Sequence, residues 1–254
     1  MTVARTWAVL AGLATLPAAL AAQAPPPPPG GLPSAAQLQD RFLGAIGGRD
    51  AIAGQPGRYE RGRFEIQSQG IRGTFELWMA PPNRQALRIE LPGLGTITGG
   101  YDGEVGWSIN PATGPSLLTG LQLDQTRQGA DLHAALHPER YIARSETVAD
   151  TVFEGRRSFK VLIETVWNER YHEFYDAETG LVTGVIRRQA SPMGELEAVT
   201  LLEDWRPLGP LLQPRRQRQR LLGIEQLLVT DSIAVGTPRD SVFALPPEIR
   251  ALRP

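Results

Sequence analysis

Apolar and polar residues alternate along most of the chain after Gly57, with the period of two that is typical of strands buried on one face. The apolar positions of the clearest segments are Phe75, Leu77, Met79, Leu87, Ile89, Leu91, Val105, Trp107, Ile109, Phe159, Val161 and Ile163. Further strands are predicted at residues 170–176, 181–189, 195–206, 215–222 and 224–230. Turn signals such as Asp102-Gly103 and Glu154-Gly155 separate the segments, so the pattern predicts an antiparallel meander.

A helical period precedes the strands. Ser34 is a suitable N-cap residue, and Gly47-Gly48 is a typical helix stop. Between them Leu38, Phe42 and Ile46 recur on one face. We therefore expect a helix over residues 34–46.

A second helix is predicted at residues 118–137, between two sets of strands. The apolar stripe of this segment consists of Leu118, Leu121, Leu132 and Leu136. Pro138 ends it, while Gly120 and Gly129 lower its helix propensity. Because such a helix must bury its apolar side, we expect it to pack on a sheet face or to plug the mouth of a barrel.

A glycine-rich stretch at residues 101–114, YDGEVGWSINPATG, raises the question of a ligand-binding loop. Asp102-Gly103 between two alternating segments favours a two-residue hairpin turn. A phosphate-binding loop opens a helix, and no helical pattern follows Gly103. We interpret the stretch as a hairpin with Trp107 on the inner face of the sheet.

The N-terminal residues have the pattern of an export signal. Arg5 precedes an apolar run, and small residues then suit cleavage after Ala21 or Ala22. We interpret residues 1–22 as a signal peptide, residues 23–33 as a proline-rich linker and residues 34–254 as a single domain. This signal predicts a periplasmic protein, and without cysteine the mature chain carries neither a lipidated cysteine nor a disulfide.

Charge and residue types disfavour several classes of function. A net charge of −1 gives no overall attraction to nucleic acid. The sequence has no cysteine and no G-x-S-x-G motif, and no acidic pair is marked for acid–base work, so we expect no enzyme. His133 and His137 have the spacing of zinc ligands on a helix, but Ala134 replaces the glutamate that a metalloprotease needs. We predict no metal and no other cofactor.

Four arginines gather near the C-terminus: Arg215, Arg216, Arg218 and Arg220. They are typical of an exposed strand whose arginine stems cover neighbouring surface. The alternative is contact with anionic lipid headgroups, where each charge contributes about 1 kcal/mol. Arg216, Arg218 and Arg220 are the candidates for such contact.

Six motifs, taken in their order, resemble the LolA/LolB-like superfamily and especially its outer-membrane lipoprotein-sorting protein group. They are ELWMAPPNR (76–84), YDGEVGWSINP (101–111), GADLHAALHPERY (129–141), EGRRSFKVLIE (154–164), YDAETGLVTGVIRR (175–188) and VFALPPEI (242–249). Together they extend over most of residues 34–250. One position departs from the family, since Pro81 stands where its lipoprotein carriers have a basic residue.

The resemblance implies an α+β, mainly antiparallel β fold, an unclosed or half-open β-barrel of about 10–11 strands with helices covering the open mouth. It also implies a non-catalytic periplasmic carrier or binder of lipids or lipoprotein acyl chains, in transport towards the outer membrane. The partners it implies are a lipid or acylated lipoprotein and an envelope membrane protein. We expect a monomer that binds no nucleic acid.

We expect the ligand-binding cavity on the inner face of the sheet. Its predicted lining is Phe75, Leu77, Met79, Leu87, Ile89, Trp107, Ile109, Phe159, Val161 and Ile163, and its predicted lid residues are Leu121, Leu132 and Leu136. Two other interpretations remain open. One is a periplasmic sensor that binds a partner protein with the same fold, and the other is an envelope scaffold whose core is filled.

Overall fold

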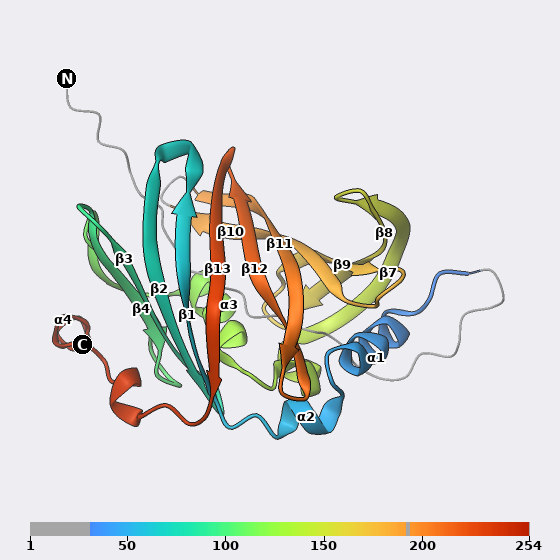
Figure 1. Cartoon of the computed structure of the whole chain (residues 1–254), viewed down its shortest axis with the longest axis horizontal. Helices are drawn as coiled ribbons and strands as arrows, with labels where there is room; N and C mark the ends of the chain where they lie inside the picture. The colour runs from blue at the N-terminus through green and yellow to red at the C-terminus, as the bar shows by residue number, and fades with distance from the viewer. Residues whose placement is uncertain (1–30, 192–193, 254) are drawn as a thin grey trace.

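The computed structural model describes residues 31–191 and 194–253, and their strands form one antiparallel sheet (Figure 1). The predicted signal peptide and most of the predicted linker lie outside the described residues. The sheet has 13 strands in the order β6-β5-β4-β3-β2-β1-β13-β12-β11-β10-β9-β8-β7 within this part of the chain. The pairing of β1 with β13 joins the first six strands to the last seven.

The strands follow the predicted meander closely. They are β1 (Arg58–Ile66), β2 (Ile71–Ala80), β3 (Arg84–Leu91), β4 (Gly95–Tyr101), β5 (Gly106–Asn110), β6 (Gly114–Leu117), β7 (Ile142–Phe153), β8 (Arg156–Thr165), β9 (Arg170–Asp176), β10 (Val182–Ser191), β11 (Gly194–Leu208), β12 (Leu211–Leu221) and β13 (Ile224–Val235). The two ends of the sheet, β6 and β7, do not pair with each other. The predicted unclosed barrel of antiparallel strands is therefore confirmed. The strand number exceeds the expected 10–11 because strands such as β1 and β7 lack a regular apolar alternation.

Short helices lie against this curved sheet. In the described residues they are α1 (Ala35–Ala45), α2 (Arg49–Ala53), α3 (Gly120–Ala130) and α4 (Pro247–Arg250), with 3-10 turns at Gln67–Gln69, Ala134–Leu136, Pro138–Arg140 and Asp240–Phe243. Figure 1 shows α3 behind β13 and β12, on the concave side, and α4 outside β3 and β4. No helix in residues 31–191 or 194–253 has both the length and the apolar character needed to cross a membrane.

The first helix forms as its sequence predicts. Ser34 and Gln37 make a capping box, in which the Ser34 hydroxyl accepts from the Gln37 backbone N–H at 3.2 Å. Leu38 and Phe42 are buried on one face, and Ile46 follows them at the C-cap. The helix thus presents its apolar stripe to the concave side of the sheet.

The second predicted helix is wrong in length and in the face it buries. After Ala130 the chain leaves the helix, because the Asp131 carboxylate accepts from the backbone N–H of His133 at 2.8 Å and favours a turn. Two 3-10 turns then replace the predicted last turns. The buried side chains of α3 include Gln125 and Gln128, so no leucine stripe faces the sheet.

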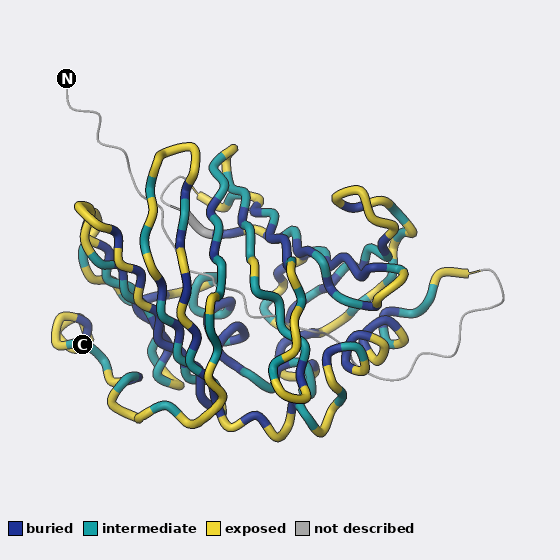
Figure 2. The backbone as a smooth tube through the Cα atoms, viewed as in Figure 1, coloured by how far each residue is buried: buried dark blue, intermediate teal, exposed yellow. Residues whose placement is uncertain are grey.

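Two apolar clusters fill the concave side. One packs α1 and α2 against β7 to β12, and its largest buried members include Phe42, Ile163, Tyr171 and Tyr175. The other packs β1 to β4 with β13 and includes Phe64, Phe75, Met79 and Ile89. Figure 2 shows these buried stretches along the strands and on α1, with exposed turns at the strand ends.

The inward placement predicted for Trp107 and Ile109 is wrong. Trp107 pairs with Gly100, and Ile109 pairs with Thr98. Neighbouring side chains on a strand point to opposite faces, and Ile97 packs into the concave cluster of β1 to β4. Trp107 and Ile109 therefore project from the outer face.

The outer face of the sheet from β2 to β6 is partly covered by the C-terminal segment, so apolar residues on this face need not be exposed. The helix α4 packs on β6, and Ile249 is fully buried. Phe243 packs with Ala80 and Ala86 on the outer side of β2 and β3. The apolar stripe of β5 therefore lies on the outer face, at the end of the sheet that the C-terminal segment partly covers.

Candidate functional site

A pocket lies on the concave side, where β1, β2, β11, β12 and β13 meet α1, α2 and the turn after α3. Its volume is about 100 Å³. Ligand sites for small molecules typically measure roughly 300–1,000 Å³. The pocket therefore admits part of a lipid-sized ligand in this conformation, and a complete acyl chain requires its covering elements to move.

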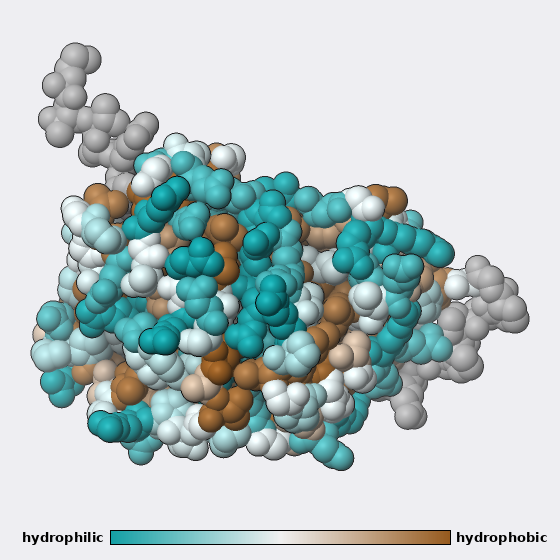
Figure 3. Space-filling model, in the orientation of Figure 1, coloured by the Kyte–Doolittle hydropathy of each residue, from teal (hydrophilic) through white to brown (hydrophobic). Residues whose placement is uncertain are grey.

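One side of the pocket is apolar. The residues are Phe42, Ile46, Ile52, Phe75, Leu77, Leu132, Ala135, Leu202, Leu211 and Leu228. The helices α1 and α2 supply the first three, so they form a cover over the sheet. In Figure 3 the visible surface is mainly polar, with apolar residues gathered near the ends of β1, β12 and β13.

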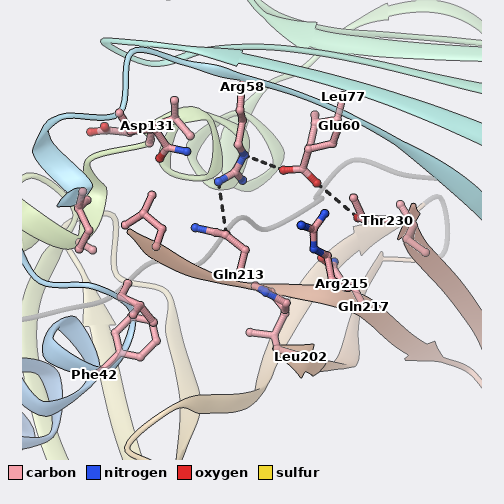
Figure 4. Close-up of a pocket in the computed structure, with 18 of the residues that line it drawn as sticks. Phe42, Arg58, Glu60, Leu77, Asp131, Leu202, Gln213, Arg215, Gln217 and Thr230 are labelled. Carbon is pink, nitrogen blue, oxygen red and sulfur yellow. Dashed lines mark hydrogen bonds and ion pairs between the residues drawn. The ribbon is translucent and has the colours of Figure 1, made fainter. Parts of the chain in front are cut away.

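The other side is polar and centred on β1 and β12 (Figure 4). Arg58 and Glu60 form a buried ion pair at 2.6 Å. The Arg58 guanidinium also donates to Gln213 Oε1 at 3.5 Å, and the Thr230 hydroxyl donates to Glu60 Oε2 at 3.4 Å. Arg215 completes this wall with Gln217. The pocket is therefore amphipathic.

The structure brings only some of the predicted lining residues to this pocket. Phe75, Leu77 and the predicted lid residue Leu132 line it. Met79, Leu87 and Ile89 lie in the apolar cluster of β1 to β4, whereas Val161, Ile163 and Phe159 belong to the α1 cluster. Trp107 and Ile109 lie on the outer face. The ligand-binding role of all the predicted lining residues remains a prediction.

The three predicted lid leucines do not form one surface. Leu132 packs against the β1–β4 cluster and Leu136 against the α1 cluster. Leu121 is half-buried on α3. The pocket is covered by residues of α1 and α2 and by the turn from Asp131 to Ala135, which contains the predicted lid residue Leu132.

The polar wall was not predicted from the sequence, although a signal for it exists. In β1, RYERGRFEI, the alternate residues Arg58 and Glu60 are in phase with Phe64 and Ile66, and all four are buried. Charged residues at inward positions of a strand indicate a polar interior site. No strand was predicted at residues 58–66. Without the structure, the alternation of these residues could therefore not be assigned to an inner and an outer face.

The arginine cluster is divided between the two faces of β12. Gln217 pairs with the buried Leu228, so Arg215 shares the inner face, and Arg216, Arg218 and Arg220 project outwards. Arg218 forms ion pairs with Glu203 and Glu225, and Arg220 forms one with Glu154. Part of the outer charge is thus balanced, and headgroup contact by these three residues remains a prediction.

A second buried polar group lies between α3 and the inner faces of β9 and β10. Arg187 binds Glu169 through two hydrogen bonds of 3.0 and 2.6 Å. Glu169 also accepts from Gln125 at 2.8 Å and from Trp167 at 3.2 Å. Burial acts to lower the pKa of Arg187, but the hydrogen bonds and charge of Glu169 raise it overall. Arg187 therefore stays charged, and the hydrogen bonds of Gln125 to Glu169 and to the carbonyl of Arg188 fix α3 to the sheet.

Glu173 lies beside this ion pair without a cation of its own. Burial raises its pKa to about 8, although the Tyr175 hydrogen bond and the nearby Arg187 charge act in the opposite direction. The residue is closed to solvent and does not line the pocket. Its position indicates a structural role in the α1 cluster.

His133 and His137, with zinc-ligand spacing in the sequence, do not share an α-helix face, because the 3-10 turn Ala134–Leu136 lies between them. His137 lies 3.5 Å from Glu139. In the described residues no group of three or more histidine, cysteine or acidic side chains is arranged to hold a metal ion.

No family model and no curated protein matches this sequence. Solved structures do match its fold. A LolA superfamily protein from Nitrosomonas europaea aligns with a TM-score of 0.56 and 10% identity over 84% of this chain and 99% of the other. A DUF1329 family protein from Desulfovibrio piger aligns with a TM-score of 0.54 and 10% identity, over 82% and 96%.

An outer membrane lipoprotein-sorting protein domain from Vibrio parahaemolyticus aligns with a TM-score of 0.50 and 10% identity, over 78% of this chain and 94% of that one. Identities this low establish the fold alone. The open sheet, its order of strands and these alignments show that the chain has the fold of the LolA superfamily.

Proposed function

We propose that this protein is a periplasmic, non-catalytic carrier that binds lipids or lipoprotein acyl chains in transport towards the outer membrane. The observation that carries the proposal is the amphipathic pocket beneath α1 and α2, whose cover includes Phe42, Ile46 and Ile52. The shared fold with an outer membrane lipoprotein-sorting domain supports it. The N-terminal export pattern supports the periplasmic location.

The energetics of the cover fit a carrier. Burial of a methylene contributes about 0.8 kcal/mol, so a chain of about 12 methylenes gains roughly 10 kcal/mol before any cost. A pocket of about 100 Å³ holds only part of such a chain. The rest has to displace the contacts of Phe42, Ile46 and Ile52, which close the pocket in its empty state. This competition lowers the net gain and allows release.

Fluorescence of Trp205 provides a test. Its ring meets the ring of Phe42 edge-on, with centroids 6.2 Å apart, so entry of a chain beneath α1 changes its surroundings. Titration with dodecanoate should shift the emission of the wild type and of Trp107→Phe, which removes an outer-face ring. The shift should be lost in Trp205→Phe.

Lipid extraction and native mass spectrometry of the protein purified from a periplasm give an independent measurement. A carrier should retain an acyl-containing molecule. An unchanged Trp205 emission together with lipid-free protein would refute the proposal. A stoichiometric protein in place of lipid would instead favour the sensor that uses the same fold.

A further inference from the structure

The polar wall of the pocket carries one positive charge that no carboxylate balances. Glu60 pairs with Arg58 at 2.6 Å, and Asp131 pairs with Arg140 at 3.4 Å. Arg215 also lines the pocket, and within residues 31–191 and 194–253 it forms no ion pair and no hydrogen bond. Among the charged residues that line the pocket in the described part of the chain, Arg215 is therefore the one without an oppositely charged partner in contact.

Neutral donors accompany Arg215 on the same face of β12. Gln213 accepts from Arg58 through Oε1, which leaves its NH₂ group to donate to a ligand. Gln217 is the next residue along this face and also lines the pocket (Figure 4). A guanidinium with adjacent amide donors matches the oxygens of a carboxylate or a phosphate, which arginine binds with two parallel hydrogen bonds.

The apolar wall begins beside these donors. Leu211 precedes Gln213 on the inner face of β12, and Phe42 and Ile46 cover it from α1. The peptide N–H of Leu212 donates to the carbonyl of Ile46 at 2.9 Å, which holds the end of α1 next to this strand. A ligand with its head at Arg215 can therefore extend its chain beneath α1.

From this arrangement we infer that the ligand is a single-chain amphiphile with an oxyanion head. The head binds Arg215 and the amides of β12, and the alkyl chain lies along Phe42, Ile46 and Leu211. This inference rests on the proposed function and specifies its class of ligand. The small volume of the pocket favours one chain over two.

Calorimetric titration with four dodecyl compounds tests the inference. Dodecanoate and dodecyl phosphate carry an oxyanion, dodecanol is neutral, and dodecyltrimethylammonium is positive. Each is titrated below its micelle concentration at pH 8 into the wild type, Arg215→Gln, Arg215→Lys and Arg61→Gln. Arg61 is the control because it is exposed on β1 and donates to Ser232 at 3.0 Å, away from the pocket.

Arg215→Gln should weaken the binding of both anions about tenfold, as expected for a lost charge-assisted hydrogen bond. Its affinity for dodecanol should stay within about twofold of the wild type, and Arg61→Gln should change neither. Arg215→Lys should recover part of the loss, because it keeps the charge without the planar fork.

Equal affinities of the wild type for the anion, the alcohol and the ammonium compound would overturn the inference and leave the proposed function intact. Acetate or inorganic phosphate binding as tightly as dodecanoate would also overturn it, because the site would then recognise a free anion. If none of the four compounds binds the wild type, the proposed function fails as well. The wild-type order of affinities tests the inference even if Arg215→Gln does not fold.

Discussion

The hydroxyl of Tyr175 donates a 2.7 Å hydrogen bond to Oε2 of Glu173, and neither side chain has appreciable contact with solvent. The same hydroxyl lies 3.2 Å from Oε1 of Gln39 on α1. The pair therefore connects the covering helix to the interior of the sheet. It also places a carboxyl group where ionisation is costly.

Stability should fall as the pH rises from about 4.5 towards 8. The folded pKa of Glu173 is about 8, above its ordinary value of 4.5, so the unfolded chain loses this proton first. The protonated Glu173 therefore stabilises the folded state fully below pH 4.5, and this contribution is lost as the pH rises through about 8. Its contribution to the free energy of unfolding is at most roughly 5 kcal/mol.

Glu173→Gln should remove most of this pH dependence. Urea unfolding of the wild type and the variant at pH 5 and pH 8.5 measures it, with Glu178→Gln as an exposed control. Equal slopes of stability against pH in wild type and Glu173→Gln would show that Glu173 does not titrate as described.

Arg187→Met should destabilise the protein by about 3–5 kcal/mol, because it leaves Glu169 buried without its cation. Arg170→Met is the matched control. Arg170 lies next to Glu169 and pairs with Glu164 at 3.2 Å, but on the exposed face, where such a pair contributes less than about 1 kcal/mol. Urea unfolding at neutral pH measures the free energy of unfolding of both variants. A similar loss of stability in Arg187→Met and Arg170→Met would contradict the importance of the buried pair.

Gly47→Ala should loosen the cover of the pocket. A Cβ at Gly47 would lie 2.3 Å from the carbonyl oxygen of Pro210, in the turn between β11 and β12. Gly48→Ala is the control, because Gly48 also has a positive φ but a Cβ added there would meet nothing within 4 Å. Thermal unfolding should show a larger loss for Gly47→Ala. Stopped-flow measurements should also show faster dodecanoate release from it, and equal release rates would contradict a cover sealed at this turn.

Binding to anionic vesicles should depend more on Arg216 than on Arg218. Arg216 is exposed and forms no ion pair within the described ranges, whereas Arg218 already contacts Glu203 and Glu225. Arg216→Gln should weaken binding by about 1 kcal/mol, roughly fivefold, at low salt. Sedimentation with anionic and with zwitterionic vesicles measures this. Unchanged binding in the triple variant of Arg216, Arg218 and Arg220 would remove the outer face as a membrane contact.

Local patterns predicted much of the secondary structure. The N-cap residue Ser34, the stripe of Leu38 and Phe42, and the alternation around Phe75 each depend on a few neighbouring residues, so the sequence predicts them without knowledge of distant segments. The region after α3 was mispredicted because one side chain, Asp131, redirects the backbone through a local hydrogen bond. The leucines beyond it then serve two different clusters.

The sequence by itself determined an antiparallel meander with a capped helix before it, and the resemblance of its motifs indicated the open barrel. Only the tertiary structure decided which face each strand turns inwards, since a period of two is identical for both faces. It placed Trp107 on the outer face and Arg215 in the pocket. The reason is physical: burial depends on which distant segment covers a strand, and the pairing of β1 with β13 brings together residues that are far apart in the chain.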